Sequence, residues 1–348
     1  MSGRKHNLPL DALIFDMDGV LVDVSASYRQ AIIQTVNRFF DTGLALDYDG
    51  EPVSLLDAED VDALKLAGGF NNDWDLTRAF IIYFLEMLPP LPMPTFPLRR
   101  HVAAILAYLQ VARGGHLPVT MNLLRQNKDI PRLARRVQAA GGGLPAIERV
   151  LTQRNRHLIE TGDNLLKGNL IQRIFQELYL GATLFEKVYG EKAVIAQTEG
   201  FIHNETLLIA PDVLATLAAE LQLGIATGRP RLEAEYTLDR LGVSDFFQSL
   251  VTHDDIVAAG AEGKPAPWSL LEAARRLHPT PARSAYVGDT PDDIRAAKAA
   301  SQTVPFLAIG VLAAAADKTA LQRHFEAAGA DIILSHPNRL PDILFRSA

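Results

Sequence analysis

Two aspartates, Asp16 and Asp18, lie one residue apart directly after a short apolar run at residues 12–15. A run of this length predicts a buried parallel strand, and ligands of doubly wound α/β sheets bind beyond the carboxyl ends of such strands. Gly19 allows the backbone to turn sharply after the second acid. Both carboxylates are therefore expected in a ligand pocket, although the pattern alone also fits a solvated Asp-x-Asp-Gly turn.

Three later segments bring further polar groups. Apolar runs at residues 223–226 and 285–287 predict two more strands, each followed by polar residues. Between them, residues 263–267 place a lysine between a glycine and a proline. The polar positions in these segments are Thr227, Gly228, Arg229, Lys264, Asp289 and Asp293.

These residue types fit the transfer of a phosphoryl group through a covalent intermediate. The carboxylate of Asp16 is the candidate nucleophile, because an aspartyl-phosphate replaces one difficult displacement by two easier ones. The turn at Gly19 can swing the carboxyl group of Asp18 back over the pocket, which makes Asp18 the candidate general acid and base. Asp18 would protonate the leaving oxygen and then activate water.

A phosphate group and a carboxylate repel each other, so this chemistry needs a cation between them. Mg²⁺ prefers oxygen ligands and keeps several waters in protein sites. The expected metal ligands are Asp16, the backbone carbonyl of Asp18, Asp289 and, behind them or through water, Asp293.

Fixed donors should bind the remaining negative charge of the phosphate. Thr227 offers a hydroxyl, Gly228 a backbone N–H and Lys264 a point charge on a flexible stem. Arg229 would either reach a substrate anion or brace the acidic loop. Two simpler alternatives are that Thr227 caps a helix and that Lys264 is a solvated loop lysine.

An acid pair, a Thr-Gly, a Lys-Pro and a Gly-Asp-x-x-x-Asp, in this order, closely resemble the four signature motifs of the haloacid dehalogenase-like (HAD) hydrolase superfamily. The resemblance covers residues 1–22 and about 206–348. It implies an α/β fold, with a doubly wound parallel-sheet (Rossmann-like) core and an inserted α-helical cap domain. It also indicates the phosphoglycolate phosphatase-like and phosphomutase-like branch, whose cap follows the first motif.

The expected cap domain spans residues 23–205, where strand-like segments disappear and helical periodicity takes over, for example at residues 170–178. Caps at this position are usually much shorter, so we expect an extra insertion at about residues 89–156. The proline-rich residues 88–97 and the glycines at 141–143 interrupt helices there.

The insertion is basic. Residues 98–156 contain eleven Lys and Arg against two acids, a net charge of +9, so the remaining chain carries −16 to give the total of −7. This asymmetry fits a lid that attracts anionic substrates, or a docking face for an acidic partner. It also fits a solvated helix face that carries Arg132, Arg135 and Arg136. Aromatic residues are too scarce there to favour nucleic-acid binding.

Another cap segment, at residues 68–74, has two glycines followed by Asn71, Asn72, an aspartate and a tryptophan. It resembles a specificity loop that a cap lowers over its substrate, which makes both asparagines candidate substrate-binding residues. The alternative is a turn between helices in which Asp73 caps the second helix.

Composition sets broader limits. A chain of 348 residues can form one large core and a second unit, and the absence of cysteine excludes disulfides, thiol catalysis and thiolate metal sites. No signal peptide and no apolar run of membrane-spanning length is visible. We therefore expect a cytoplasmic protein.

The most consistent prediction is a Mg²⁺-dependent phosphatase for a small phosphorylated metabolite, such as a sugar phosphate or a phosphoglycolate-like acid, with no membrane partner. A phosphomutase keeps the same motifs and is one alternative. A catalytically idle regulatory or binding module that uses the basic insertion is another. Asp18 argues against a dehalogenase, which lacks the second acid of this motif. A phosphonate hydrolase would need a cap lysine for a Schiff base, for which Lys65 is the only early-cap candidate.

Overall fold

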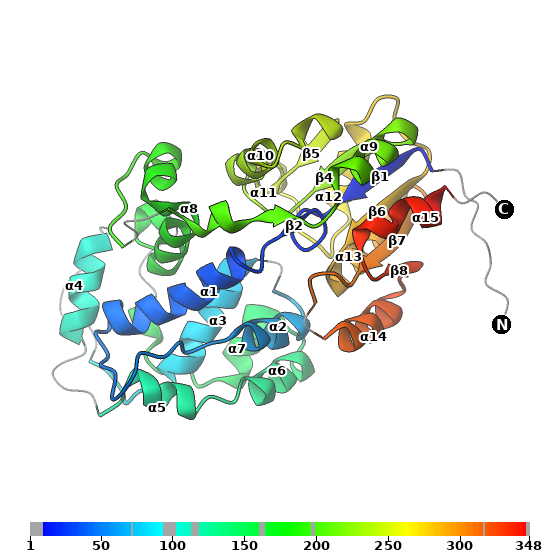
Figure 1. The fold of residues 1–348 in the computed structure, drawn as a ribbon. Helices are drawn as coiled ribbons and strands as arrows, with labels where there is room; N and C mark the ends of the chain where they lie inside the picture. The colour runs from blue at the N-terminus through cyan, green and yellow to red at the C-terminus, as the bar shows by residue number, and fades with distance from the viewer. Residues whose placement is uncertain are drawn as a thin grey trace. The chain divides into compact units, whose positions relative to one another are not determined.

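The computed structural model describes residues 10–70, 72–92, 102–112, 118–159, 164–195, 199–315 and 317–345. The chain divides into two compact units (Figure 1). The core unit contains Met1–Val24 and Glu205–Ala348, and the cap unit contains Ser25–Asn204.

The core unit is built on a six-stranded sheet with the strand order β5-β4-β1-β6-β7-β8, and all neighbouring strands are parallel. The central strand β1 is buried along its whole length, as expected for a parallel strand that helices cover on both faces. The predicted α/β fold is thus confirmed. The strands are β1 Ala12–Phe15, β4 Gln222–Ala226, β5 Ser249–Val251, β6 Ser284–Gly288, β7 Phe306–Val311 and β8 Ile332–Leu334.

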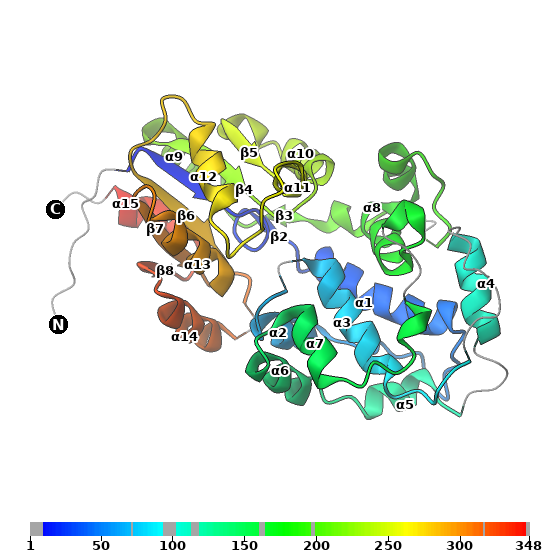
Figure 2. The same cartoon turned by 180° about the vertical axis from the view of Figure 1, so that it is seen from behind.

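Helices cover both faces of this sheet. Alternate strand residues such as Leu13 and Phe15 pack with apolar residues of α9, α10 and α15 in one core cluster. Helices α12 and α13 contact the strands from the other face, and Figures 1 and 2 show them on the side opposite to α9 and α15. The core helices are α9 Pro211–Glu220, α10 Arg231–Arg240, α11 His253–Ala258, α12 Trp268–Arg275, α13 Pro291–Ala300, α14 Lys318–Ala328 and α15 Leu340–Leu344, with 3-10 turns η5 Ser244–Phe246 and η6 Pro337–Arg339.

A short antiparallel ribbon completes the core unit. Strand β2, Val22–Asp23, pairs with β3, Thr206–Leu207. Before β2 the chain forms a tight loop, in which the N–H groups of Leu21 and Val22 both donate to the carbonyl of Met17 at 2.9 Å. The ribbon therefore fixes the end of the acidic loop that begins at Asp16.

The cap unit is helical in its described part, as the periodicity predicts. Its longest helix, α8, is interrupted at Gly181, where φ is 73° and ψ is 168°. Helix α1 packs against α3 and α8, and Tyr28 stacks on Tyr179 with ring centroids 4.3 Å apart. Within the described ranges of the chain, no helix is long and apolar enough to cross a membrane. The cap helices are α1 Tyr28–Arg38, α2 Ala58–Leu66, α3 Asp73–Leu85, α4 Val102–Ala112, α5 Met121–Gln126, α6 Ile130–Ala139, α7 Gly143–Val150 and α8 Leu170–Tyr189, with a π-helical turn η1 Phe39–Gly43 and 3-10 turns η2 Arg156–Leu158, η3 Leu165–Lys167 and η4 Phe201–Asn204.

The two glycine-rich turns of the cap unit lie against each other. The N–H of Gly143 donates to the carbonyl of Gly68 at 2.9 Å, and a Cβ on Gly69 would lie 2.7 Å from the nitrogen of Gly143. The glycines at 68–69 and 141–143 all have positive φ. A side chain at Gly69, Gly142 or Gly143 would prevent this close approach of two backbones, and the positive φ at Gly68 and Gly141 also favours glycine. These glycines therefore have a structural reason that does not depend on a ligand.

Candidate active site

The register of the sheet places the ends of three strands at one edge. Phe15 of β1 aligns with Ile225 of β4 and with Val287 of β6. The N–H of Asp16 continues this pairing and donates to the carbonyl of Val287 at 2.8 Å. The side chains that follow the three strands at this edge are Asp16, Thr227 and Asp289.

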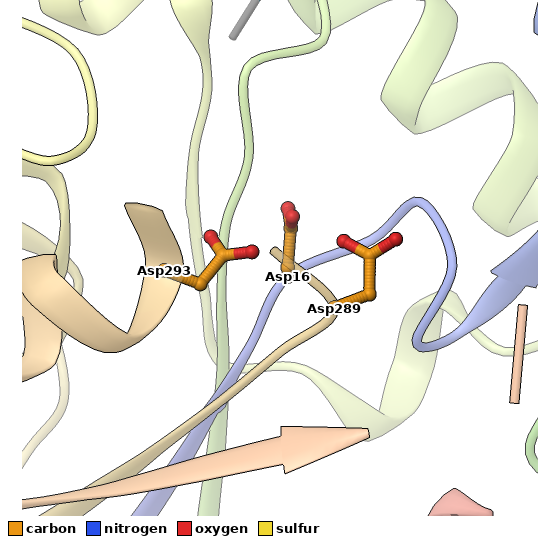
Figure 3. A group of neighbouring side chains, drawn as sticks. All are labelled: Asp16, Asp289 and Asp293. Carbon is orange, nitrogen blue, oxygen red and sulfur yellow. The ribbon is translucent and has the colours of Figure 1, made fainter. Parts of the chain in front are cut away.

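Figure 3 shows Asp16, Asp289 and Asp293 side by side, on the loops after β1 and β6 and the first turn of α13. Each offers a carboxylate oxygen, and these three oxygens lie within 4.8 Å of one another. Asp16 and Asp293 are buried, and Asp289 is half-buried. Three of the four predicted metal ligands therefore lie together. The fourth, Asp18, was expected to contribute its backbone carbonyl.

The electrostatics of Asp16 fit a bound cation. Burial raises the pKa of Asp16 to about 7, and the charges of Asp293 and Asp18 add to this effect, while Lys264 opposes it. Carboxylates that are crowded in a buried place repel one another, and a divalent cation bound by their oxygens relieves that repulsion. A compact set of oxygen donors is also the ligand type that Mg²⁺ prefers.

Lys264 lies among these acids. Its Nζ is 2.9 Å from Oδ2 of Asp16 and 2.7 Å from Oδ1 of Asp293. Burial lowers the pKa of Lys264, but the two acids outweigh burial and hold this pKa well above its usual value. Lys264 is thus a fixed positive charge at the predicted nucleophile. The alternative of a solvated loop lysine is wrong.

Tyr286 helps to position the ammonium group of this lysine. Lys264 Nζ donates to the hydroxyl of Tyr286 at 3.0 Å, and that hydroxyl donates to the carbonyl of Ala226 at 3.0 Å. Burial raises the pKa of Tyr286 well above its usual value, so the phenol stays protonated. This role of Tyr286 could not be predicted from the sequence, because an aromatic residue inside an apolar run is typical of strand packing.

Asp293 supports both the lysine and the loop. It accepts hydrogen bonds at Oδ2 from the N–H and hydroxyl of Thr290, at 2.9 and 2.6 Å, within the capping box that begins α13. Burial raises the pKa of Asp293, but Lys264 and Thr290 lower it by more. Asp293 is therefore stabilised as a carboxylate.

Gly19 lies so close to the side chain of Asp289 that only a glycine fits at this position. It has a φ of +72°, and a Cβ at this position would lie 2.1 Å from Oδ2 of Asp289. The glycine therefore allows both the turn after Asp18 and the approach of Asp289 to the acidic loop.

Thr227 is 1% exposed and follows β4 directly. Its Oγ1 accepts a hydrogen bond from the N–H of Arg229 at 3.2 Å. Helix α10 begins only at Arg231 and its N-cap is Pro230, so the alternative in which Thr227 caps a helix is wrong. Gly228 is exposed beside Thr227, which leaves its backbone accessible.

Arg229 braces the acidic loop. Its Nε donates to Oδ1 of Asp18 at 2.6 Å, and its other nitrogens bind Glu205 and Thr237. The side chain is 1% exposed. Of the two roles considered for Arg229, these contacts favour bracing over binding of a substrate anion.

The candidate residues of the cap have mixed outcomes. Asn71 lies outside the described residues. Asn72 is the N-cap of α3, and its Oδ1 accepts from the N–H groups of Trp74 at 2.8 Å and Asp75 at 3.3 Å. The alternative in which Asp73 caps this helix is wrong as to the residue, because Asp73 is the first residue of α3 and Asn72 reaches the free N–H groups. Lys65 Nζ lies 3.7 Å from Asp73.

Comparisons with curated proteins give two kinds of relative. A protein of Phytophthora nicotianae named imidazoleglycerol-phosphate dehydratase is 27% identical over 306 residues, which cover 87% of this chain and 44% of that protein. A phosphoglycolate phosphatase of Salmonella typhi is 36% identical over 121 residues, which cover 34% of this chain and 42% of the enzyme. The chain thus spans less than half the length of the curated relatives it matches.

A structure solved by the Northeast Structural Genomics Consortium superposes with a TM-score of 0.61 at 21% identity, over 96% of this chain and 98% of the other. At this identity, the match supports the fold. The family model described as haloacid dehalogenase-like hydrolase matches residues 10–301, which include every residue of the acidic cluster. Since the match extends over most of the sequence, the chain belongs to the haloacid dehalogenase-like hydrolase family.

Proposed function

We propose that the protein is a Mg²⁺-dependent phosphatase that hydrolyses a small phosphate monoester through an aspartyl-phosphate on Asp16. One observation carries the proposal: Asp16 lies in a cluster of three acids together with Lys264, at the carboxyl edge of the sheet. This arrangement offers a nucleophile, oxygen ligands for a cation and a fixed positive charge for phosphate oxygens.

The metal site would consist of Asp16, Asp289 and the backbone carbonyl of Asp18, with Asp293 behind them. Bound Mg²⁺ would neutralise part of the phosphate charge and so allow the phosphate to approach a carboxylate. Thr227, Gly228 and Lys264 would donate hydrogen bonds to the phosphate oxygens and keep the phosphorus in line with Asp16.

The reaction would take two steps. In the first, a carboxylate oxygen of Asp16 bonds to phosphorus, the bond from phosphorus to the ester oxygen breaks, and Asp18 gives that oxygen its proton. In the second, Asp18 takes a proton from water, the water oxygen bonds to phosphorus, and the bond to Asp16 breaks to release inorganic phosphate. Asp18 regains in the second step the proton that it gave in the first.

Among the relatives, phosphoglycolate phosphatases support a small phosphorylated acid as substrate, and sugar phosphates fit the same site chemistry. The assembled site argues against an idle binding module, because such a module has no need of a buried lysine between two acids that include the nucleophile.

Measurement of phosphate release from a panel of phosphate monoesters, with Mg²⁺ and with a chelator, tests the proposal. We expect Mg²⁺-dependent release from at least one sugar phosphate or phosphorylated small acid. Isomerisation of a sugar phosphate without net release would show a phosphomutase instead. The absence of both reactions across the panel would contradict the proposal.

A single substitution should reveal the metal site. Asp289→Asn removes a charged ligand from a site that the protein coordinates only in part, so the Mg²⁺ concentration for half-maximal activity should rise roughly tenfold or more. Asp292→Asn is the matched control: this buried neighbour pairs with Arg295 and lies outside the cluster. An equal Mg²⁺ requirement in the wild type and Asp289→Asn would remove Asp289 from the metal site.

The basic insertion supplies a second, independent proposal, that its charge speeds the arrival of anionic substrates. On α6 the side chains of Arg132 and Arg135 are exposed, and the described residues offer them no acidic partner. Arg136 donates to the carbonyl of Val150 and so also has a structural contact. Arg132 and Arg135 are therefore the cleaner pair for a test.

Replacing Arg132 and Arg135 together by Gln should lower kcat/KM and leave kcat nearly unchanged. The loss should shrink toward 1 M salt, where the screening length falls to about 3 Å. Replacing the exposed Arg323 and Lys318 of the core unit by Gln controls for the change in net charge. Unchanged kinetics at every salt concentration would favour a docking or solvated face, and a salt-independent fall in kcat would contradict steering.

A further inference from the structure

A buried ion network adjoins the acidic loop, and it contains a carboxylate that no sequence motif includes. The side chain of Glu205 is fully buried and faces the guanidinium of Arg229. Two hydrogen bonds join them, from Nη2 to Oε1 at 2.9 Å and from Nη1 to Oε2 at 3.1 Å. This is the paired geometry in which a guanidinium binds a carboxylate most specifically.

The contacts of Arg229 account for its whole guanidinium. Besides Glu205, Nη1 donates to Oγ1 of Thr237 at 3.1 Å, and Nε and Nη2 lie 2.6 and 2.5 Å from Oδ1 of Asp18. Every N–H of the side chain can thus be assigned to a protein acceptor. Arg229 thus binds the carboxylates of both Glu205 and Asp18, and these two contacts together set the position of its guanidinium.

Glu205 is itself fixed by groups that do not touch Asp18. The hydroxyl of Thr237 donates to Oε2 of Glu205 at 2.8 Å, and Nη2 of Arg240 donates to its backbone carbonyl at 2.8 Å. Both partners lie on α10. The network therefore ties the orientation of Arg229 to a helix of the core unit.

The geometry at Asp18 has a chemical consequence. Arg229 contacts Oδ1 of Asp18 twice, which leaves Oδ2 as the oxygen that can exchange a proton with substrate. Without Glu205, the buried guanidinium would lose its paired carboxylate, and it could turn to bind both oxygens of Asp18. The oxygen that exchanges the proton would then be occupied or displaced.

We propose that Glu205 is a positioning residue for the proton transfer by Asp18 and that it acts through Arg229. The inference rests on the proposed phosphatase function. Glu205 touches neither the nucleophile nor the acidic cluster, so its loss should affect the protonation of the leaving group and not the attack by Asp16.

Leaving-group dependence tests this role. A simple alkyl phosphate needs its leaving oxygen protonated, whereas p-nitrophenyl phosphate releases a stable anion that hardly needs a proton. Because kcat/KM reports the steps up to departure of the leaving group, it isolates the acid step from the later activation of water. In Glu205→Gln, we expect kcat/KM to fall roughly 10-fold to 100-fold for the alkyl ester and less than about threefold for p-nitrophenyl phosphate.

Two further variants serve as the positive and the negative control for Glu205→Gln. Asp18→Asn should show the same selectivity with a larger loss, because it removes the acid itself. Asp255→Asn removes a carboxylate that pairs with Arg231 and Arg276 elsewhere in the core unit, and it should change both esters equally or not at all. If Glu205→Gln does not fold, Thr237→Val removes one hydroxyl from the network and should show a smaller selective loss.

Equal losses on the two esters in Glu205→Gln and Thr237→Val, or no loss, would overturn the positioning role while Asp18→Asn remains selective. If the wild-type protein hydrolyses neither ester nor any member of the substrate panel, the proposed function itself fails and the inference falls with it. Selective loss in both network variants, with Asp255→Asn unselective, would support it.

Discussion

Asp16→Asn is expected to lower phosphatase turnover by at least about 10⁴-fold, because the amide cannot form the aspartyl-phosphate and the neighbouring acids Asp289 and Asp293 are the proposed metal ligands. The fold should remain intact. Burial and the neighbouring acids raise the pKa of Asp16 to about 7 although Lys264 opposes them, so without a metal the ionised carboxyl group costs more free energy in the folded protein than in the unfolded chain. Replacing it by a neutral group of the same shape should therefore leave the melting temperature unchanged or raise it without Mg²⁺.

Fluoroberyllate separates loss of the nucleophile from a general defect. It mimics an acyl phosphate only when a carboxylate holds it, so Mg²⁺-dependent binding is expected for the wild type and for Asp292→Asn, but not for Asp16→Asn. Binding is measured by the shift in melting temperature. If Asp16→Asn kept most of its activity, Asp16 could not be the nucleophile.

The sequence was sufficient to locate the residues of the acidic cluster. Each of these residues lies at or shortly after the end of an apolar run that forms a buried parallel strand. Neighbouring parallel strands have their carboxyl ends at the same edge of the sheet, even when the strands are far apart in the sequence. That rule alone places Asp16, Thr227 and Asp289 at one edge. It needs no knowledge of side-chain contacts.

The same reasoning could not find Glu205. It lies in an irregular segment just before β3, and its partner Arg229 is 24 positions away. No periodicity or spacing joins two such residues, because their contact depends on how α10 packs beside the acidic loop. Arg229 itself was recognised, but the choice between substrate binding and bracing required the acceptors around its guanidinium.

The residue that caps α3 also could not be predicted from the sequence. Asn72 and Asp73 are both good N-cap residues, and only the backbone angles decide between them: Asn72 has an extended conformation, with φ −132° and ψ 120°, that aims its oxygen at the free N–H groups of α3. The glycines at 68–69 raised the idea of a specificity loop, yet they meet the glycines at 141–143 through a contact between distant backbones.

Lys264→Ala should lower kcat/KM by roughly 10²–10³-fold, the cost of removing one charged donor from a site that stabilises a transferring phosphate. It should not raise the Mg²⁺ requirement, because Lys264 is a competing cation near the acids and not a ligand. Asp289→Asn is expected to show the opposite pattern. Titration of activity with Mg²⁺ for both variants measures the two effects together.

The melting temperature provides a second test of the role of Lys264. Without Lys264, Asp16 and Asp293 keep their negative neighbours. They lose the ammonium group, which lies 2.9 Å from Asp16 and 2.7 Å from Asp293. The melting temperature of Lys264→Ala should therefore fall in a chelator and recover partly with Mg²⁺. Lys264→Arg keeps the charge, but a planar guanidinium does not match the place of a compact ammonium beside Tyr286, so it should restore stability more than turnover. A raised Mg²⁺ requirement in Lys264→Ala, with none in Asp289→Asn, would mean that the two residues have exchanged the roles assigned to them.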